Sequence, residues 1–591
     1  MPLATPTPAR RLCLASWLAL ALLCLPGLLA AQAPRAIQLQ LLGVEDELHS
    51  TLLNNLSVRQ LSNDQYPAQT DFLFRRGDRE LLDALRALGY YRAEVVGSLQ
   101  REQDRTLIRF QIQRGPAVQI RSLSLRIRGP GANEQAWRDY RQFDLPLKTG
   151  QRLVHADYEK TISDLMNIAH NHGYLDARYL QRRFEVSPER GEAAIFIELE
   201  TGEAYLFGTV SFDPATTIEH NFLQRFVEFR PGDRFSNSAL SELQQTLISS
   251  RYFSMVRYEP RFTEQQERQI PVHVQLEDNL PHRYRVGLGA GSDTGARLLF
   301  GFENRLVNKD GHRYEFDGLL GQRAQSALFN YSIPGRRPAR QKWNLRTGWE
   351  ATQSDVLERS RTTLMPEYTH LTRSDWLLAP YVSLEREVFS YSDEDRQISQ
   401  LLLGGIGVQK RVLNQTSYPS RGYRHNLALR TSQRNPISDS EFTQLDLGSK
   451  GIYSPRDNWR LIARGRIATT WSDELEELPA SYRFLLGGET LRGFAFESVG
   501  LPTEDGGITG AKHMALASLE TDYRLTRWFG VAAFSDAGQV YDDKIDTQLK
   551  IGSGVGLRGF TPVGVVRLDM AWAISEPERP WRLHFSLGLD L

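Results

Sequence analysis

The feature that most constrains the fold is a series of alternating segments that fills the chain from about residue 280 to its end. In 459–471, for example, apolar residues alternate with arginines: Trp459, Leu461, Ala463 and Ile467 against Arg460, Arg464 and Arg466. A period of two predicts β-strands whose faces meet different surroundings. A soluble β-domain also alternates, but it seldom places arginine after arginine on one face. The pattern therefore favours the wall of a transmembrane β-barrel.

The length of this region sets the expected number of strands. It spans about 310 residues, which at roughly 19 residues per strand and connection gives about 16 antiparallel strands, an even number. The mean hydropathy of the chain is −0.42, and past residue 30 we find no apolar run long enough for a spanning helix. A membrane crossing would therefore need a closed barrel. The net charge is zero, which gives no indication of a nucleic-acid partner.

The first 31 residues have the pattern of a signal peptide. Two arginines, Arg10 and Arg11, precede an apolar segment over 12–29, and small alanines follow it. An uncleaved anchor helix is the alternative, which the dipeptide Pro26-Gly27 disfavours. We therefore expect residues 1–31 to be a signal peptide for secretion.

Between this segment and the barrel, one arrangement occurs three times. Each copy has an opening strand, helices, a helix followed by an aromatic residue, and a closing strand of period two. The three helices end at Gly89-Tyr90-Tyr91, Gly173-Tyr174 and Tyr252-Phe253. A repeat of about 80 residues predicts small α+β domains with separate cores. We place them at 36–116, 117–203 and 204–279, before a barrel at 280–591. Open sheet edges in such domains can pair with an extended strand of another chain.

No catalytic or cofactor site is indicated. The two cysteines, Cys13 and Cys24, both lie in the signal segment, so the mature chain would have no disulfide and no thiolate. There is no G-x-S-x-G turn and no distinctive pair of carboxylates. Gly-x-Gly patterns at 287–291 and 552–556 do not lie between a strand and a helix, so they do not indicate a nucleotide site. We expect no enzyme activity, no cofactor and no metal.

One stretch in the barrel region combines glycines, an arginine and an aromatic residue: Gly487-Gly488-Glu489-Thr490-Leu491-Arg492-Gly493-Phe494. Taken alone it would be an ordinary surface turn. Within a barrel, we expect it to be a loop folded back into the lumen, where its glycines let the backbone pass close to the wall. A guanidinium in such a place needs a carboxylate partner.

Three repeats before a barrel with an Arg-Gly-Phe loop resemble the BamA/TamA superfamily of outer-membrane assembly proteins, whose repeats are POTRA domains. Four motifs carry the resemblance: the loop residues Gly487, Gly488, Arg492, Gly493 and Phe494; Pro419-Ser420-Arg421-Gly422-Tyr423; Phe534-Ser535-Asp536-Ala537-Gly538; and the acidic strand position Glu520. Three POTRA domains resemble the TamA type, since BamA typically has five and two-partner-secretion transporters have two.

The resemblance implies a role for several of these residues. Arg492 would pair with Asp536, and also with Glu520, which would fix the loop to the barrel wall. The barrel would open sideways at a seam between its first and last strands. The seam residues would be Gly287, Gly289 and Gly291 in the first strand and Phe585, Gly588 and Leu591 in the last. The terminal Leu591 departs from the family, in which the last residue is commonly aromatic.

The resemblance also implies a function without catalysis. It suggests a translocation and assembly factor in the outer membrane of a Gram-negative bacterium, with its N-terminal domains in the periplasm. Such a factor helps to insert or secrete β-barrel proteins such as autotransporters. Its partners would be a TamB-like periplasm-spanning protein, unfolded barrel clients and outer-membrane lipid. The alternative is a two-partner-type secretion pore that exports one dedicated polypeptide. A porin would have no use for the three repeats, and an outer-membrane enzyme would need a nucleophile or an acid/base set, for which the sequence offers no candidate.

Overall fold

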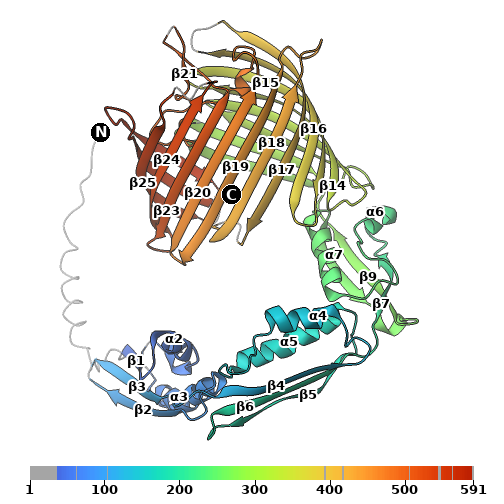
Figure 1. The fold of residues 1–591 in the computed structure, drawn as a ribbon, viewed down its shortest axis with the longest axis vertical. Coiled ribbons are helices and arrows are strands. Elements are labelled where there is room, and N and C mark those ends of the chain that lie inside the picture. Colours follow the sequence, from blue (N-terminus) through green and yellow to red (C-terminus); the bar gives the residue numbers. More distant parts are fainter. Residues whose placement is uncertain are drawn as a thin grey trace, which may run out of the picture. The chain divides into compact units, whose positions relative to one another are not determined.

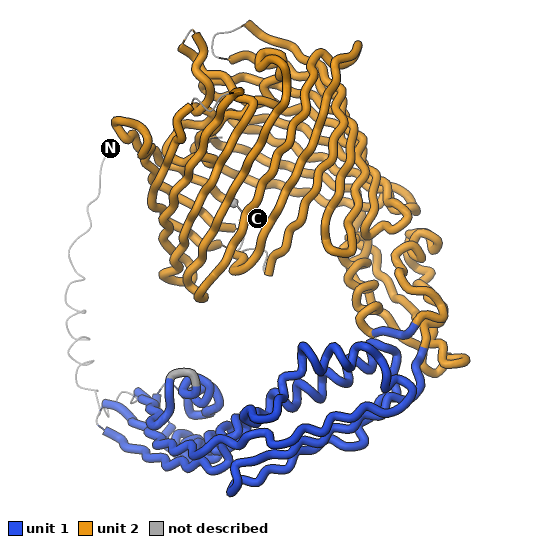
Figure 2. Tube along the Cα trace, in the orientation of Figure 1, with its two compact units in different colours: residues 1–205, 234–236 blue, residues 206–233, 237–591 orange. Residues whose placement is uncertain are grey.

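The computed structural model describes residues 36–588, apart from 62, 65, 103, 294, 392–394, 415–417, 505, 544–546 and 562–563. The expected signal peptide, 1–31, and the expected seam residue Leu591 lie outside the described residues. The chain forms two compact units, which Figure 2 shows in different colours. The first comprises Met1–Tyr205 and Arg234–Ser236, and the second comprises Leu206–Asp233 and Asn237–Leu591.

Three small α/β domains precede the barrel along the chain (Figure 1). The first contains β1 (Ala36–Leu42), α2 (Asp46–Asn54), η1 (Ser57–Gln60), α3 (Pro67–Ala87), β2 (Glu94–Arg101) and β3 (Arg105–Gln113). The second contains β4 (Gln119–Arg128), α4 (Gln135–Asp139), η2 (Tyr140–Asp144), α5 (His155–Asn171), β5 (Arg178–Ser187) and β6 (Glu192–Glu200). The third contains β7 (Leu206–Phe212), α6 (His220–Gln224), α7 (Asn237–Ser249), β8 (Phe253–Pro260), η3 (Phe262–Glu264) and β9 (Gln269–Asp278).

All three domains share one sheet topology. The closing strand lies in the centre, parallel to the opening strand and antiparallel to a middle strand, in the orders β1-β3-β2, β4-β6-β5 and β7-β9-β8. The sequence pattern missed the middle strands. In β2 and β5 no residue is fully buried, so their polar and apolar residues give only a weak periodic signal.

Each core joins the central strand to the longest helix. In the first domain Ile108 and Phe110 of β3 pack with Leu81 and Leu85 of α3, and all four are fully buried. Gly77 lies in the middle of α3 because a Cβ there would come within 2.4 Å of the Phe110 ring. A glycine inside a helix costs about 0.5–1 kcal/mol, and the burial of the phenylalanine offsets that cost.

Sixteen of the described strands of the C-terminal region form one antiparallel sheet, as the sequence predicts, with each strand paired to the next barrel strand along the chain. The strands are β10 (His282–Gly291), β11 (Gly295–Asn304), β12 (Arg313–Gly321), β13 (Ala324–Pro334), β14 (Gln341–Gln353), β15 (Leu357–Leu371), β16 (Trp376–Tyr391), β17 (Gln397–Leu413), β18 (Arg421–Ser432), β19 (Phe442–Arg456), β20 (Trp459–Trp471), β23 (His513–Arg524), β24 (Phe529–Tyr541), β25 (Lys550–Thr561), β26 (Gly564–Ala573) and β27 (Trp581–Gly588). The sheet curves into a nearly closed barrel (Figure 1).

The two faces of the barrel differ as the alternation predicts. In β20 the outward Leu461 and Ile467 are exposed on the protein surface, whereas Arg460 points inward and is 1% exposed. In β10 Tyr284, Val286 and Leu288 project outward. An apolar outer face and a charged inner face are what a barrel in lipid requires. Among the described residues, no helix has the length and apolar character needed to cross a membrane.

The third domain is attached to the barrel within the second unit. The Tyr252 hydroxyl donates to the carbonyl of Gly311, in the connection between β11 and β12, at 2.5 Å. Arg340, between β13 and β14, lies 3.0 Å from Glu228 and 3.3 Å from Glu242 of the domain. These contacts identify the end of the barrel at which the domain lies, here called the domain end.

The first and last strands, β10 and β27, are the two edges of the sheet, and no ladder joins them in the described part of the chain. A backbone hydrogen bond from Ser292 N to Phe585 O, 3.3 Å long, connects these edges. The seam between these edges is therefore the weakest line in the wall.

Candidate functional site

The long connection between β20 and β23 folds into the barrel lumen. It contains η4 (Ala480–Tyr482), β21 (Leu501–Pro502) and β22 (Ile508–Thr509). Its buried apolar residues pack against the inner face of the wall, in a cluster that joins Phe484, Leu486, Leu491, Phe494, Val499 and Ala511 to Ala468, Met514, Val540 and Ala573. The structure thus places the Gly487–Phe494 stretch inside the barrel.

The same loop also reaches the opposite part of the wall. The hydroxyl of Tyr482 donates to Glu385 of β16 at 2.7 Å, and Ser481 N donates to Glu387 of the same strand at 3.0 Å. Gln444 of β19 donates to the Tyr482 carbonyl at 2.9 Å. The loop therefore crosses the lumen and is held on both sides.

Arg492 is the most strongly bound residue of the loop, and it is 4% exposed. Its Nε and Nη2 donate to Oδ2 and Oδ1 of Asp536 at 2.8 and 2.9 Å, and its backbone N–H donates to Asp536 Oδ2 at 3.1 Å. Its Nη1 donates to Glu520 at 2.8 Å and to Asp569 at 3.0 Å. A bidentate guanidinium–carboxylate pair is among the stronger polar contacts in proteins.

A second arginine completes this buried network. Arg558 of β25 donates to Glu520 at 2.8 Å and to Asp522 at 3.2 Å, and it also bonds Asp569. Arg460 bonds Asp522, and Arg464 lies 3.6 Å from Asp536. Four carboxylates (Glu520, Asp522, Asp536, Asp569) thus face four guanidinium groups (Arg460, Arg464, Arg492, Arg558). The Arg464 side chain is partly exposed, and the balance of charge allows the other seven ions to be buried together.

The residues of Phe534-Ser535-Asp536-Ala537-Gly538 form the wall side of the site. The Arg492 guanidinium carbon lies 3.4 Å from the centre of the Phe534 ring, which adds a cation–π contact. Asp536 supplies the bidentate acceptor. A Cβ on Gly538 would come within 2.8 Å of the loop residue Leu486. The motif therefore provides the ring, the carboxylate and the space that the loop needs.

Two glycines let the loop backbone approach the wall. Gly493 has φ +98°, and a Cβ there would lie 2.9 Å from the backbone of Trp572. A Cβ on Gly552 of β25 would lie 1.8 Å from the Arg492 carbonyl oxygen. Gly552 belongs to the Gly-x-Gly pattern for which a nucleotide site was excluded, and its absent side chain leaves room for the loop.

The loop tip touches both edges of the seam. Glu489 N donates to Oδ2 of Asp293, in the turn after β10, at 2.8 Å. Gly493 N donates to Nε2 of His584 in β27 at 3.1 Å. His584 Nδ1 lies 4.0 Å from Asp293 Oδ1. Asp293, His584, Asp569 and Arg558 cannot be identified from the sequence alone, because their meeting depends on how the barrel closes.

The structure also places the expected seam residues. Gly287, Gly289 and Gly291 are in β10, on the inward face that Arg285 shares through its ion pairs with Glu315 and Asp317 of β12. The Phe585 carbonyl accepts the hydrogen bond from Ser292, and Gly588 lies opposite Val565 of β26.

An aromatic residue lies at the domain end of the barrel. Tyr418, in the connection between β17 and β18, contacts the edge of the Phe560 ring, with 4.8 Å between ring centres. The guanidinium carbons of Arg460 and Arg524 lie 3.9 and 4.2 Å from the centre of its ring. Pro419, which follows it, is buried. The Pro-x-x-Gly motif thus brings a tyrosine against residues of β20, β23 and β25.

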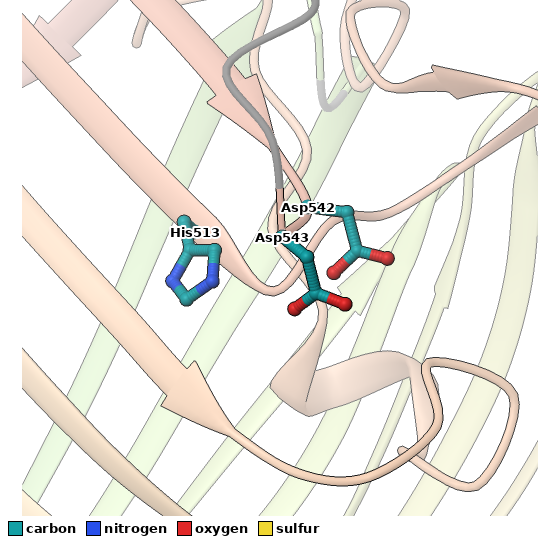
Figure 3. Close-up of side chains that lie close together, drawn as sticks. All are labelled: His513, Asp542 and Asp543. Carbon is teal, nitrogen blue, oxygen red and sulfur yellow. The ribbon is translucent and has the colours of Figure 1, made fainter.

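Three potential metal ligands gather where β23 begins and β24 ends: His513, Asp542 and Asp543, with ligand atoms within 4.8 Å of one another (Figure 3). The Lys512 ammonium lies 3.5 Å from Asp542 and 3.6 Å from Asp543. His513 Nδ1 is hydrogen-bonded to Thr469 at 2.6 Å. Because Lys512 already balances part of the acidic charge, we assign no ion to this cluster.

Comparison with known proteins agrees with this architecture. A POTRA domain model, described as TamA domain 1, matches residues 38–114. The structure is similar to that of BamA from Haemophilus ducreyi lacking POTRA domains 1–3, with a TM-score of 0.61 and 16% identity over 80% of this chain and 99% of that one. It is also similar to CdiB from Acinetobacter baumannii, with a TM-score of 0.47 and 13% identity over 80% and 90% of the two chains.

The C-terminal region gives the most extensive match. A model of the Omp85 superfamily domain matches residues 283–591, which is more than half of the chain and includes every barrel strand but the first residue of β10. Together with the TamA-type POTRA match before it, this region agrees with the resemblance inferred from the motifs. The chain belongs to the Omp85 superfamily, the group that contains the BamA and TamA assembly proteins.

Proposed function

We propose that this protein is an outer-membrane translocation and assembly factor that helps to insert or secrete β-barrel proteins such as autotransporters. The POTRA-like domains accept extended client strands by edge pairing. The client strands then enter the membrane through the seam of the barrel. No step requires bond chemistry, so the protein acts without a catalytic residue or a cofactor.

The observation that carries the proposal is the seam. Two strand edges meet there with unpaired backbone groups, and such an edge is a template for pairing with another strand. Among the described residues, one backbone hydrogen bond, the 3.3 Å bond between Ser292 and Phe585, joins the two edge strands, which makes this line the least costly one to open. A client strand added at the seam would form hydrogen bonds with the backbone groups of both edge strands as it leaves the lumen.

The lumenal loop serves as the internal support of the barrel while the seam opens. Arg492 fixes the loop to β23, β24 and β26 through Glu520, Asp536 and Asp569. β23 and β24 lie away from the seam, so the loop stays attached to them when its contacts with Asp293 and His584 separate.

The proposed location is the outer membrane of a Gram-negative bacterium, with the domains at 36–116, 117–203 and 204–279 in the periplasm. The proposed partners are a TamB-like periplasm-spanning protein, unfolded barrel or autotransporter clients, and outer-membrane lipid. The TamA-type POTRA match at 38–114 supports the choice of partner.

Reconstitution tests the function directly. The purified protein in lipid vesicles should accelerate the folding of an added, urea-unfolded β-barrel client, followed by its heat-dependent mobility in gels. Arg492→Ala should remove the acceleration, and Arg323→Ala should retain it, because Arg323 forms an exposed ion pair with Asp355, 3.6 Å away, between two barrel connections. Equal acceleration by vesicles with and without the protein would contradict the proposal.

The alternative, a two-partner-type secretion pore, predicts another outcome. A pore exports its substrate through the lumen, so it would move a dedicated polypeptide into the vesicles without inserting it in the bilayer. Protection of the added polypeptide from external protease, without membrane insertion, would favour the pore.

A further inference from the structure

A cavity of about 400 Å³ lies at the domain end of the barrel, between the third domain and the inner face of β12–β15. The domain contributes Arg251 and Tyr252, and the wall contributes Arg313, Ser332, Lys342, Asn344 and Arg346. The seam and the loop network involve none of these residues. The site described above therefore leaves this cavity without a role.

A row of hydrogen bonds makes the floor of the cavity rigid. The Ser332 hydroxyl donates to Asn344 Oδ1 at 2.8 Å, and Asn344 Nδ2 donates to Glu367 at 3.1 Å. All three residues are buried. Arg313 lies opposite Ser332 in the ladder between β12 and β13. It therefore follows Ser332 at the end of the hydrogen-bonded row that is away from Glu367.

The charges of the cavity are not balanced. Arg346 is paired with Glu367 at 3.0 Å, and Arg251 lies 3.6 Å from Glu303. Glu303 is also shared with Arg283 and Arg305, at 3.9 and 3.6 Å. Glu315 also lines the cavity, but it is paired with Arg285. In the described part of the chain, the side chains of Arg313 and Lys342 form no hydrogen bond and no ion pair with a protein group, so these two cations face the cavity without a partner of their own.

Two cations beside fixed amide and hydroxyl groups suit an oxyanion ligand. A guanidinium donates two parallel hydrogen bonds to a carboxylate, and an ammonium adds a point charge. Water alone can also solvate such cations at a surface, but here they lie in a cavity whose floor holds further polar groups. The cavity is thus equipped to bind an anion.

The orientation of the strands favours a polypeptide over a lipid as the source of this anion. In β14, Lys342, Asn344 and Arg346 point into the lumen, whereas Trp343 and Leu345 point outward. A phospholipid headgroup at the outer face would meet the tryptophan and not the cations. An extended chain that enters the barrel from the domain end would pass directly beside the cavity.

We propose that this cavity binds carboxylate groups of an acidic polypeptide segment as the segment enters the barrel, with Arg313 and Lys342 as the binding cations. The inference deepens the proposed function, since the polypeptide would be the client. It would apply equally to a chain destined for the seam or for export.

Peptide binding to the full-length protein in detergent micelles tests the inference. The probe is a fluorescein-labelled ten-residue peptide of alternating aspartate and glycine, and the comparison peptide has asparagine in place of aspartate. We expect the aspartate peptide to bind at least about tenfold more tightly, the difference typical of lost charge-assisted hydrogen bonds. The preference should weaken as salt is raised. Equal affinity for the two peptides would overturn the proposal.

Substitutions then locate the binding. The double variant Arg313→Gln, Lys342→Gln should lose the preference for aspartate. Lys309→Gln, which removes one exposed positive charge from the nearby β11–β12 connection, should keep it. Heat-dependent gel mobility verifies that each variant has a folded barrel. A double variant with an unchanged preference would overturn the assignment of the site.

Two further measurements are needed. The first tells a polypeptide carboxylate from a lipid headgroup, and the second tests the proposed assembly function separately from anion binding in the cavity. Nanodiscs with and without phosphatidylglycerol report lipid binding. Loss of lipid binding, with peptide binding intact, in the double variant would overturn the polypeptide assignment. The vesicle assay of client folding with the parental protein tests the proposed function alone. If the parental protein does not accelerate folding, the result of the peptide experiment still holds.

Discussion

The backbone N–H of Glu489, at the tip of the lumenal loop, donates to the carboxylate of Asp293, in the turn after the first barrel strand, at 2.8 Å. Four residues further along the loop, Gly493 N donates to His584 in the last strand at 3.1 Å. The loop that Arg492 fixes to β23, β24 and β26 therefore also joins the two edges of the seam. The loop thus connects the buried ion-pair network around Arg492 with the seam between β10 and β27.

Asp293→Ala removes the acceptor that holds the loop tip to the first hairpin. We expect amide hydrogen exchange in β10 and β27 to become about tenfold faster, because the loss of one charge-assisted hydrogen bond costs about 1.5–3 kcal/mol. Exchange in β23 and β24 should stay unchanged, since Arg492 still binds them. Hydrogen-exchange mass spectrometry measures both regions, and Asp310→Ala, in an exposed connection, is the control. Equal exchange rates of β10 and β27 in the variant and the parent would show that the contact between Glu489 and Asp293 does not hold the seam.

Arg492→Ala leaves three buried carboxylates with one cation fewer. Breaking a buried ion pair costs about 3–5 kcal/mol, so the barrel should lose its heat-resistant gel form at a clearly lower temperature. The double variant Arg492→Ala, Asp536→Ala removes one of the stranded charges and should be more stable than the sum of its single changes implies. Arg323→Ala should cost less than about 1 kcal/mol, because its ion pair with Asp355 is exposed. Strict additivity would show that the pair is not coupled.

Gly552→Ala introduces a methyl group only 1.8 Å from the Arg492 carbonyl oxygen. We expect it to displace the loop from the wall and to expose the loop to protease, with a destabilisation of about 1–3 kcal/mol from overpacking. Gly404→Ala, in β17, has no atom within 4 Å of the new Cβ and should be neutral. Protease digestion of intact cells or vesicles compares the two variants. Similar digestion of both would mean that the space at Gly552 does not determine the position of the loop.

Tyr418→Ala removes the ring that lies against Arg460, Arg524 and Phe560 at the domain end. We expect a higher ion conductance in planar bilayers and a loss of about 1–2 kcal/mol from the cation–π contacts. Tyr418→Phe keeps the ring and should keep the parental conductance. If the alanine variant conducts like the parent, the tyrosine does not restrict this end of the lumen.

Some of this structure was predictable from the sequence because it depends on local patterns. The alternation of Leu461 and Ile467 with Arg460 identifies a barrel strand without any knowledge of its neighbours. The total length then gives sixteen strands, as found. The middle strands β2 and β5 were missed because they have no fully buried position to establish a period.

The partners of Arg492 show where sequence reasoning ends. Asp536 and Glu520 could be named because they belong to motifs. Asp569 lies on the inward face of its strand, but its contact with the loop depends on the path of forty residues through the lumen. Asp293 and His584 are almost three hundred residues apart, and only closure of the barrel brings them to 4.0 Å.

Controlled closure of the seam tests the central claim most directly. The bond from Ser292 N to Phe585 O sets Gly291 opposite Ser586 on the inward face, so cysteines at these two positions can be joined. For Gly291→Cys, Ser586→Cys in vesicles, we expect the oxidised protein to stop accelerating client folding and the reduced protein to regain the parental rate. Equal acceleration by the oxidised and reduced forms would contradict assembly through the seam.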